Sequence, residues 1–209
     1  PDLAGFWNDL GQNWYIQQQY IKLYPVCRWA QPAVEGALAL MRDHDVHAHQ
    51  IAKIRVETFQ EAKRLATIPT TTEQAQYSLP FPVAAAVVRG TVGVAEVTKD
   101  GLNDPQIIAL AQLVEITEDD TFNAAFPARR FARTHFHLNN GRVLSSNVTE
   151  AQGDPEEKLA DQVIWDKFRS LTSPVLGIEW SEHFLKTARA IANAPSVNPL
   201  FDLMTPPPK

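Results

Sequence analysis

The stretch ARRFARTHFHLNNGRVLSSNVT, residues 128–149, carries the strongest β-sheet signal in the chain. Its first part alternates between two kinds of side chain: Ala132, Thr134, Phe136 and Leu138 on one face, and Arg133, His135 and His137 on the other. Such alternation is typical of a strand with one buried and one polar face. Asn-Asn-Gly at 139–141 is typical of a hairpin turn. The stretch therefore predicts a β-hairpin whose apolar face lies in a core.

Outward from this hairpin, the pattern predicts one more strand and several helices. The strand is predicted over residues 51–59, where apolar and polar side chains again alternate. Helices are predicted over residues 6–20, from Pro32, up to Gly90, over 104–116, from Asp154 to before Pro174, and from a cap at Ser181. This order of elements predicts an α+β module of roughly 130 residues with helical ends that belong to a second layer or body.

Composition excludes several classes of protein. The 209 residues carry a formal net charge of −5 and no basic block, which argues against binding to nucleic acid or to a membrane surface. The single cysteine, Cys27, excludes an internal disulfide. No run of 18 apolar residues and no signal peptide is found, so we expect a cytoplasmic protein.

A cluster of polar side chains precedes the helix predicted from Pro32. The stretch YIKLYPVCRWAQPAVEGALALM, residues 20–41, places Lys22, Cys27, Arg28 and Gln31 before the first helical turn. The N-terminus of a helix favours an anion, and cations beside it strengthen that preference. Alternatively, Lys22 and Arg28 are surface cations and Cys27 is a small buried residue. The pattern alone leaves both interpretations open.

Other candidate residues give weaker signals. The histidines at 44, 47, 49, 135 and 137 show no spacing typical of a metal site, so no metal is predicted. The acidic run at 115–120 is interpreted as a solvated turn. Tyr77 and Ser78 lie in a proline-flanked segment that is either functional or packed. No glycine-rich nucleotide motif or nucleophile elbow is present.

Four stretches resemble, in the same order, segments of the MmgE/PrpD family, which includes 2-methylcitrate dehydratase, cis-aconitate decarboxylase and iminodisuccinate epimerase. YIKLYPVCRWAQPAVEGAL resembles the family pattern K-x-Y-P-x-C-R-x-x-H-P-A-x-x-A, and TTEQAQYSLPFPVAAAVVRG resembles T-x-x-E-A-x-x-S-x-x-Y/F-x-x-A-x-x-x-x-x-G. THFHLNNGRVL is similar to a family hairpin, and GDPEEKLADQVIWDKFRSLTSPVLG is similar to G-D-P-x-x-P-L-S-x-x-x-x-x-x-K-F. The resemblance spans nearly the whole chain.

The resemblance implies that this sequence is the C-terminal half of a family protein. Residues 1–19 would end a large helical domain, 20–152 would form a small α/β lid domain with a hairpin-containing sheet, and 153–209 would return to the helical domain. The N-terminal helical half would then be a separate chain or a segment missing from this sequence. By analogy with the family, a dimer or higher oligomer is expected.

The resemblance also implies roles for individual residues. Lys22 matches the pocket lysine of the family and would pair with a substrate carboxylate and assist proton transfer. Cys27 and Arg28 match its C-R pair, and Arg28 would hold a carboxylate. Gln31 stands where many members have His, and an amide cannot titrate. Tyr77 and Ser78 would face the pocket from the lid.

The activity implied is that of a cofactor-independent lyase, half of whose active site lies in this chain. It would dehydrate or decarboxylate a small di- or tricarboxylate by removing a proton next to a carboxylate, with no metal or organic cofactor. Dehydration is the first expectation, although Gln31 weakens it. The alternatives are an epimerase or isomerase of the same family, a non-catalytic partner subunit, and a stand-alone binding module.

Overall fold

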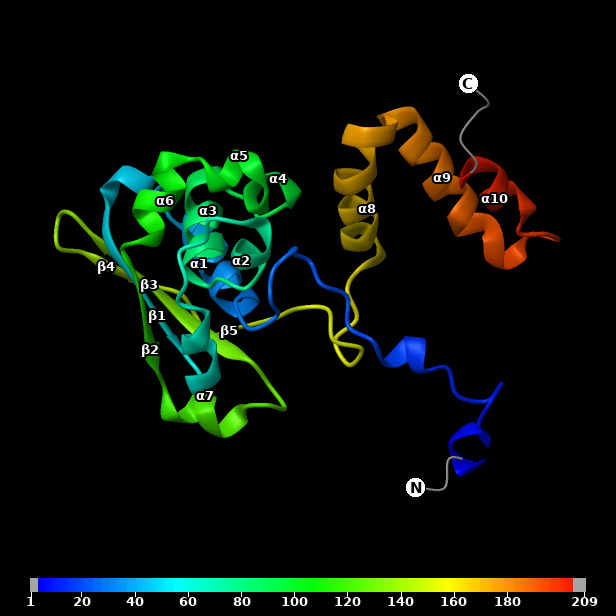
Figure 1. Cartoon of the computed structure of the whole chain (residues 1–209), viewed down its shortest axis with the longest axis horizontal. Helices are drawn as coiled ribbons and strands as arrows, with labels where there is room; N and C mark the ends of the chain where they lie inside the picture. Colours follow the sequence, from blue (N-terminus) through cyan, green and yellow to red (C-terminus); the bar gives the residue numbers. More distant parts are fainter. Residues whose placement is uncertain (1–3, 205–209) are drawn as a thin grey trace. The chain divides into compact units, whose positions relative to one another are not determined.

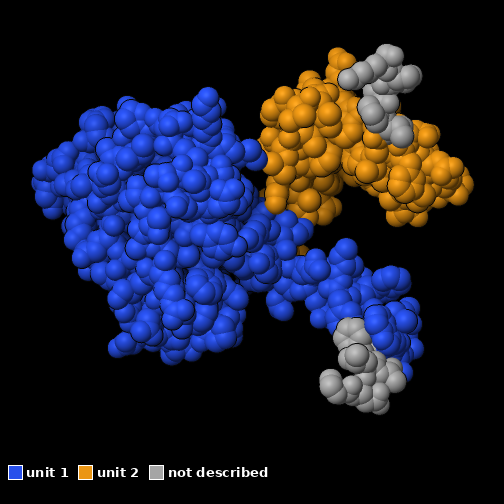
Figure 2. All heavy atoms as spheres, viewed as in Figure 1, with its two compact units in different colours: residues 1–157 blue, residues 158–209 orange. Residues whose placement is uncertain are grey.

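The computed structural model describes residues 4–204, shown in Figure 1. The chain divides into two compact units, residues 1–157 and residues 158–209, which are coloured separately in Figure 2. The predicted boundaries at residues 19 and 152 stay predictions, and residues 1–3 and 205–209 of the outer ranges lie outside the described residues.

A five-stranded mixed sheet organises the first unit. Its strands are β1 (Ile51–Thr58), β2 (Val114–Glu118), β3 (Phe131–Leu138), β4 (Val143–Ser145) and β5 (Thr149–Glu150). The order is β2-β1-β3-β4, and β5 pairs with β3 beyond β4. β1 and β2 run parallel, whereas β3 is antiparallel to β1, β4 and β5. The predicted hairpin and the predicted strand at 51–59 are confirmed, and the fold class is α+β.

Strand β2 departs from the prediction. The helix predicted over residues 104–116 ends at Ala111, and Val114–Glu118 pairs with β1 instead. The β-branched side chains of Val114, Ile116 and Thr117 favour an extended backbone. The free edge of β1 supplies backbone hydrogen-bond partners for these residues. The pattern of residues 104–118 alone does not show that such an edge lies beside them. The acidic run at 115–120 is therefore partly strand rather than a turn.

Helices cover one face of this sheet (Figure 1). The α-helices of the first unit are α1 (Gln31–Asp43), α2 (Thr72–Gln76), α3 (Pro80–Arg89), α4 (Val94–Val97), α5 (Lys99–Leu102), α6 (Pro105–Ala111) and α7 (Asp120–Ala125). Shorter 3-10 helices span Ala4–Trp7, Tyr15–Gln18, Ala48–Gln50 and Gln60–Leu65. The predictions of a helix from Pro32 and of a helix capped by Gly90 are confirmed.

The core lies between α1, α3 and the apolar face of β1 and β3. Ile54, Val56 and Phe136 are each fully buried there. α1 approaches β3 so closely that a Cβ on Gly36 would lie 2.7 Å from Thr134 Oγ1. A side chain at Gly36 would therefore force the helix away from the sheet. The opposite face of the sheet carries the polar side chains, as the alternation predicted.

The segment before residue 20 is not the helix predicted there. It forms two short 3-10 turns, and Tyr15–Gln18 has no buried residue. Gly11 separates them with φ of 77°, a conformation that other residues rarely adopt and that interrupts a helix. Without an apolar face packed on a core, so short a helix is not stabilised.

The second unit is a helical hairpin followed by one more helix. It contains α8 (Asp161–Leu176), α9 (Ile178–Ala190), a 3-10 turn at Ile191–Asn193 and α10 (Asn198–Met204). Phe168, Trp180 and Phe184 stack between α8 and α9, with ring centroids 5.0 to 6.4 Å apart. Among residues 158–204 only Ser181 and Leu185 are buried.

The helix boundaries of this unit differ from the predictions. α8 begins at Asp161 rather than near Asp154, and it continues through Pro174 to Leu176. Proline fits near the helix end because it removes only one donor, and Gly177 then ends the helix with φ of 88°. Ser181 lies inside α9, where its hydroxyl donates to the Gly177 carbonyl 2.9 Å away. No helix between residues 4 and 204 is both long enough and apolar enough to cross a membrane.

Candidate active site

The candidate site lies where the chain enters and leaves the sheet module. The N–H of Ile21 donates to the carbonyl of Gly153 at 2.9 Å, so residues 20–28 run beside residues 151–154. Arg28 continues this contact across 126 residues of sequence by pairing with the carboxylate of Asp154. The structure thus joins the Cys-Arg stretch to the Gly-Asp-Pro stretch, two segments that sequence comparison alone left separate.

Arg28 already has partners within its own chain. Its Nη1 donates to the carbonyl of Gln152 at 3.1 Å, and its Nη2 donates to the carbonyl of Ala151 at 3.1 Å and to Asp154. The residue is 5% exposed, and the Tyr20 ring lies 4.2 Å from its Cζ. Nε is buried and has no hydrogen-bond partner. Arg28 therefore fixes the entry and exit segments together, and its role in holding a substrate carboxylate stays a prediction.

Gln31 and Cys27 organise the turn before α1. Gln31 is 1% exposed, and its Nε2 donates to the carbonyls of Val26 at 3.2 Å and Tyr24 at 3.4 Å. The Cys27 N–H donates to the carbonyl of Gln76 at 2.6 Å. This bond brings the turn against the end of α2, one residue before Tyr77. The amide of Gln31 therefore satisfies two carbonyls of the turn as a neutral donor.

Tyr77 and Ser78 differ sharply in exposure. Ser78 is fully buried, and its hydroxyl donates to the Thr67 carbonyl at 2.7 Å while accepting from the Phe81 N–H at 3.2 Å. It therefore satisfies a free N–H at the start of α3. Tyr77 is 65% exposed, so its side chain is open to a ligand or to another chain.

Lys22 is partly exposed on the entry segment, directly after the residue that bonds Gly153. The structure brings Lys22, Cys27, Arg28 and Gln31 onto one continuous stretch and places Cys27 against Gln76. Of these residues, Arg28 pairs with Asp154. Their roles in binding or catalysis stay predictions.

The sequence analysis did not identify Glu35, a half-buried acid on α1. Its carboxylate accepts a hydrogen bond from the Tyr24 hydroxyl at 2.8 Å. Burial raises the pKa of Glu35 above its ordinary value, against the opposing effects of the Tyr24 hydrogen bond and the Arg42 charge. Burial, together with the Glu35 charge, likewise raises the pKa of Tyr24. The sequence signal that pointed to Glu35 was its position four residues after Gln31, on the same face of the helix.

A hollow of about 480 Å³ is lined in part by Asp154. Its wall includes Gln18, Tyr20, Ala128, Arg129, Glu150, Asp154, Pro155, Glu156 and Glu157. Arg129 pairs there with Glu150 and lies 3.6 Å from Glu157. Four carboxylates against one guanidinium make the wall acidic, so this hollow does not suit a di- or tricarboxylate. Residues 4–204 contain no group of three or more His, Cys, Asp or Glu side chains that could hold a metal ion.

Comparison with known protein families matches residues 24–193 to the MmgE/PrpD C-terminal domain. No curated protein matches the chain. The matched range includes Cys27, Arg28, Gln31, Tyr77 and Ser78, and Lys22 lies two residues before it. The Arg28–Asp154 ion pair therefore lies wholly within the matched domain.

Proposed function

Because this chain belongs to the MmgE/PrpD family, we propose that it is part of a cofactor-independent lyase acting on a small di- or tricarboxylate. Dehydration removes a proton next to a carboxylate and expels hydroxide, which leaves as water, whereas decarboxylation expels carbon dioxide and returns a proton to the carbanion that remains. The observation that carries this proposal is the family match over residues 24–193. The convergence of the entry turn and the end of α2 on the Cys27–Gln76 bond supports it.

Lys22 is the cation of this turn that we assign to the substrate. Arg28 is nearly buried and ion-paired with Asp154, whereas Lys22 is partly exposed. An ammonium group beside a substrate carboxylate stabilises the negative charge that develops when the neighbouring carbon loses its proton. We assign Arg28 a positioning role, because it holds the turn on which Lys22 lies.

The same site also suits an epimerase or isomerase. Such an enzyme removes and returns a proton next to a carboxylate without expelling a leaving group. Gln31 favours this second candidate, because an amide cannot protonate a departing hydroxide as a histidine could.

The proposal includes a partner, the N-terminal helical half of the family, as a separate chain or as a further segment. The α8–α9 hairpin exposes a group of large apolar side chains, with exposed fractions from 38% to 79%: Val163, Leu171, Val175, Leu176 and Ile178. Exposed apolar surface of this kind marks an interface. We propose that a helical partner covers this surface. If the chain has no such partner, its active site is incomplete, and the alternative proposal is a non-catalytic subunit that binds a ligand.

The first test is to purify the native assembly and compare its intact mass under native and denaturing conditions. The assembly is then assayed with 2-methylcitrate, cis-aconitate and iminodisuccinate. We expect a second helical component and turnover of one substrate, and Lys22→Ala is expected to lower kcat/KM by about 100-fold.

Lys63→Ala is the matched control, because Lys63 forms a surface ion pair with Glu118 away from the turn and should leave kcat/KM unchanged. An assembly with both halves that turns over none of the three substrates would refute the catalytic proposal. Equal activity of Lys22→Ala and the unsubstituted protein would refute the role of Lys22.

A further inference from the structure

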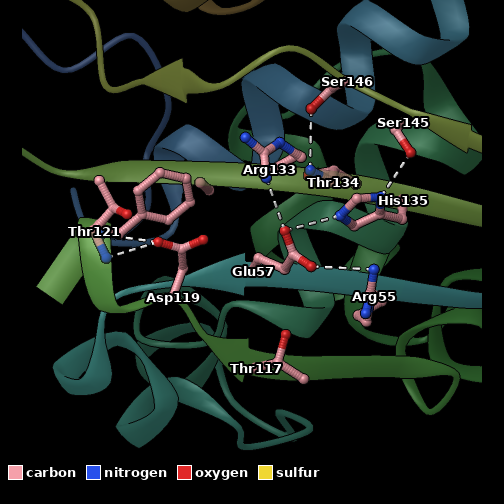
Figure 3. A network of polar contacts seen from close by, with 12 residues as sticks. Arg55, Glu57, Thr117, Asp119, Thr121, Arg133, Thr134, His135, Ser145 and Ser146 are labelled. Carbon is pink, nitrogen blue, oxygen red and sulfur yellow. Dashed lines mark hydrogen bonds and ion pairs between the residues drawn. The ribbon is translucent and has the colours of Figure 1, made fainter.

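The polar face of the sheet carries a connected network of charged and hydroxyl side chains, shown in Figure 3. Arg55 and Glu57 come from β1, Arg133 and His135 from β3, and Ser145 from β4. The lyase proposal uses none of these residues. They are separate from the entry turn and lie on the face opposite the helices.

The strand register explains why His135 and Ser145 meet. His135 lies directly opposite Ser145 in the β3–β4 ladder. In this ladder the Leu138 N–H donates to the Arg142 carbonyl, and the Ser146 N–H donates to the Thr134 carbonyl. Residue pairs 138/142 and 134/146 are therefore the hydrogen-bonded kind, and such pairs alternate with non-hydrogen-bonded pairs along the strands. His135 and Ser145 are thus a non-hydrogen-bonded pair, whose side chains approach most closely in an antiparallel sheet.

His135 joins a hydroxyl to a carboxylate. Its Nδ1 lies 2.7 Å from Ser145 Oγ, and its buried Nε2 lies 3.2 Å from Glu57 Oε2, an ion-pair contact that lacks hydrogen-bond geometry. The imidazole is 6% exposed, while Ser145 is exposed. The hydroxyl is therefore accessible from solvent, and the imidazole that contacts it is held in place by packing.

Glu57 is held as a carboxylate. Arg55 lies 3.1 Å and Arg133 lies 3.2 Å from its oxygens. Burial acts to raise the pKa of Glu57, but His135, Arg55 and Arg133 outweigh it and lower the pKa below its ordinary value. A carboxylate facing Nε2 favours the tautomer with its proton on that nitrogen. Nδ1 then presents its lone pair to the Ser145 hydroxyl, which donates to it.

We propose that Ser145 is a nucleophile activated by His135 and Glu57, forming a second site that takes activated esters of carboxylic acids. Glu57 is a positioning residue, because it acts through the imidazole. The three groups have the roles of a serine–histidine–carboxylate triad, with the two imidazole nitrogens exchanged: Nδ1 faces the serine and Nε2 faces the carboxylate. The N–H of Ser145 points away from β3, since residue 145 belongs to a non-hydrogen-bonded pair at the edge of the sheet. That N–H is available to bind an oxyanion.

The reaction proceeds in two steps, acylation of Ser145 and hydrolysis of the acyl-serine. Ser145 Oγ bonds to the acyl carbon while His135 Nδ1 takes the hydroxyl proton. The ester C–O bond then breaks, and the departing alkoxide takes that proton to leave as an alcohol. Water next attacks the acyl-serine with His135 again as base, releasing the carboxylic acid and restoring the serine.

The test is to incubate the full chain with a fluorophosphonate probe and map the adduct by peptide mass spectrometry. We expect one adduct at Ser145, formed with loss of fluoride, and slow turnover of p-nitrophenyl acetate. Ser145→Ala should abolish both, and His135→Gln should slow labelling by about 100-fold. Glu57→Gln should slow it as well, and Glu57→Asp should restore part of the rate.

Ser170→Ala is the matched control, because the Ser170 hydroxyl is exposed and donates only to the Lys167 carbonyl at 2.8 Å. It should label at the unsubstituted rate. Labelling that is absent, that maps to another serine, or that persists unchanged in His135→Gln would overturn the proposal. Because Ser145 is exposed on an edge strand, we expect Ser145→Ala to keep the native circular dichroism spectrum. A loss of labelling in this variant would then reflect the missing hydroxyl and not unfolding.

Discussion

The two compact units of this chain differ most in what their helices bury. In the first unit, α3 buries eight of its side chains, Pro80 to Val87, against the sheet and its neighbouring helices. In the second, the sixteen residues of α8 include none that is buried. The sequence of α8 carries an apolar stripe beside polar residues, whereas that of α3 is apolar from Pro80 to Val88. The comparison shows that an apolar stripe predicts a helix, but that only the elements packed on it determine whether the stripe stabilises the unit.

The comparison also assigns different tasks to the two units. The sheet module has a continuous core and can be stable by itself, because burial of its apolar side chains offsets the loss of chain entropy. The helical hairpin has a much smaller buried interior: the rings of Phe168, Trp180 and Phe184 stack between α8 and α9, and Arg169 pairs with Glu182 at the surface. Its exposed apolar surface is the one that the proposed helical partner would cover.

The largest expected effect tests this difference with matched phenylalanines. Phe136→Ala should destabilise the sheet module by about 3–5 kcal/mol, because Phe136 is fully buried between β1, β4 and the helices. Phe184→Ala should cost under about 1 kcal/mol in the isolated chain, since its neighbours are open to water. Urea denaturation combined with hydrogen exchange measures both. Equal losses would mean that the hairpin is a stable unit without a partner.

The next effect compares one ion pair from each unit. Arg28 and Asp154 have side chains 5% and 34% exposed, whereas Arg169 and Glu182 are 29% and 47% exposed. A double-mutant cycle with Arg28→Met and Asp154→Asn should give a coupling of about 2 kcal/mol, because removing one partner strands a buried group. The cycle with Arg169→Met and Glu182→Gln should give under about 1 kcal/mol.

These two cycles also locate the end of the sheet module. A coupling near zero for Arg28 and Asp154 would mean that the module ends before residue 151. It would further remove the basis for treating Arg28 as the residue that positions the entry turn.

The smallest expected effect concerns the pH dependence of the sheet module. Because burial raises the pKa of Glu35, the native state keeps this proton to higher pH than the unfolded chain does. Stability should therefore fall as pH rises from the ordinary glutamate value towards the raised one. Glu35→Gln should remove this fall while leaving Tyr24 an acceptor oxygen. Urea midpoints from about pH 4 to about pH 7 measure it.

Glu57→Gln provides a control of opposite sign for that experiment. The pKa of Glu57 is lowered, so its contribution is present above the ordinary glutamate value and is lost as pH falls. A variant of Glu35 whose stability curve runs parallel to that of the unsubstituted protein would contradict the prediction.

Periodicity was sufficient for the elements that bury a face by themselves. The alternation in 131–138 and the Asn-Asn-Gly turn predicted β3, its partner strand and the buried face correctly. The same reasoning failed at Val114–Glu118, whose five residues are too short to show a period and are extended because β1 offers a parallel edge. It failed again at Asp154, which has the features of a helix cap but pairs with Arg28 instead.

For the candidate site, the resemblance singled out segments of the chain, and the structure showed which contacts their residues make. The resemblance singled out the stretches around Lys22, Arg28, Ser78 and Gly153. The fold showed that Arg28 is already paired and that Ser78 is used at the start of α3. Glu35 was missed because its raised pKa arises from burial, which one sequence does not display.

The sequence by itself determined the family, the hairpin and the helical stripes, because these depend on residue order and on periods of two and 3.6 residues. Only the tertiary structure decided which stripes are covered, which charges are paired and which of the polar residues meet. Those properties depend on contacts such as Arg28–Asp154 and His135–Ser145 with Glu57, which are formed between distant segments by strand register and packing.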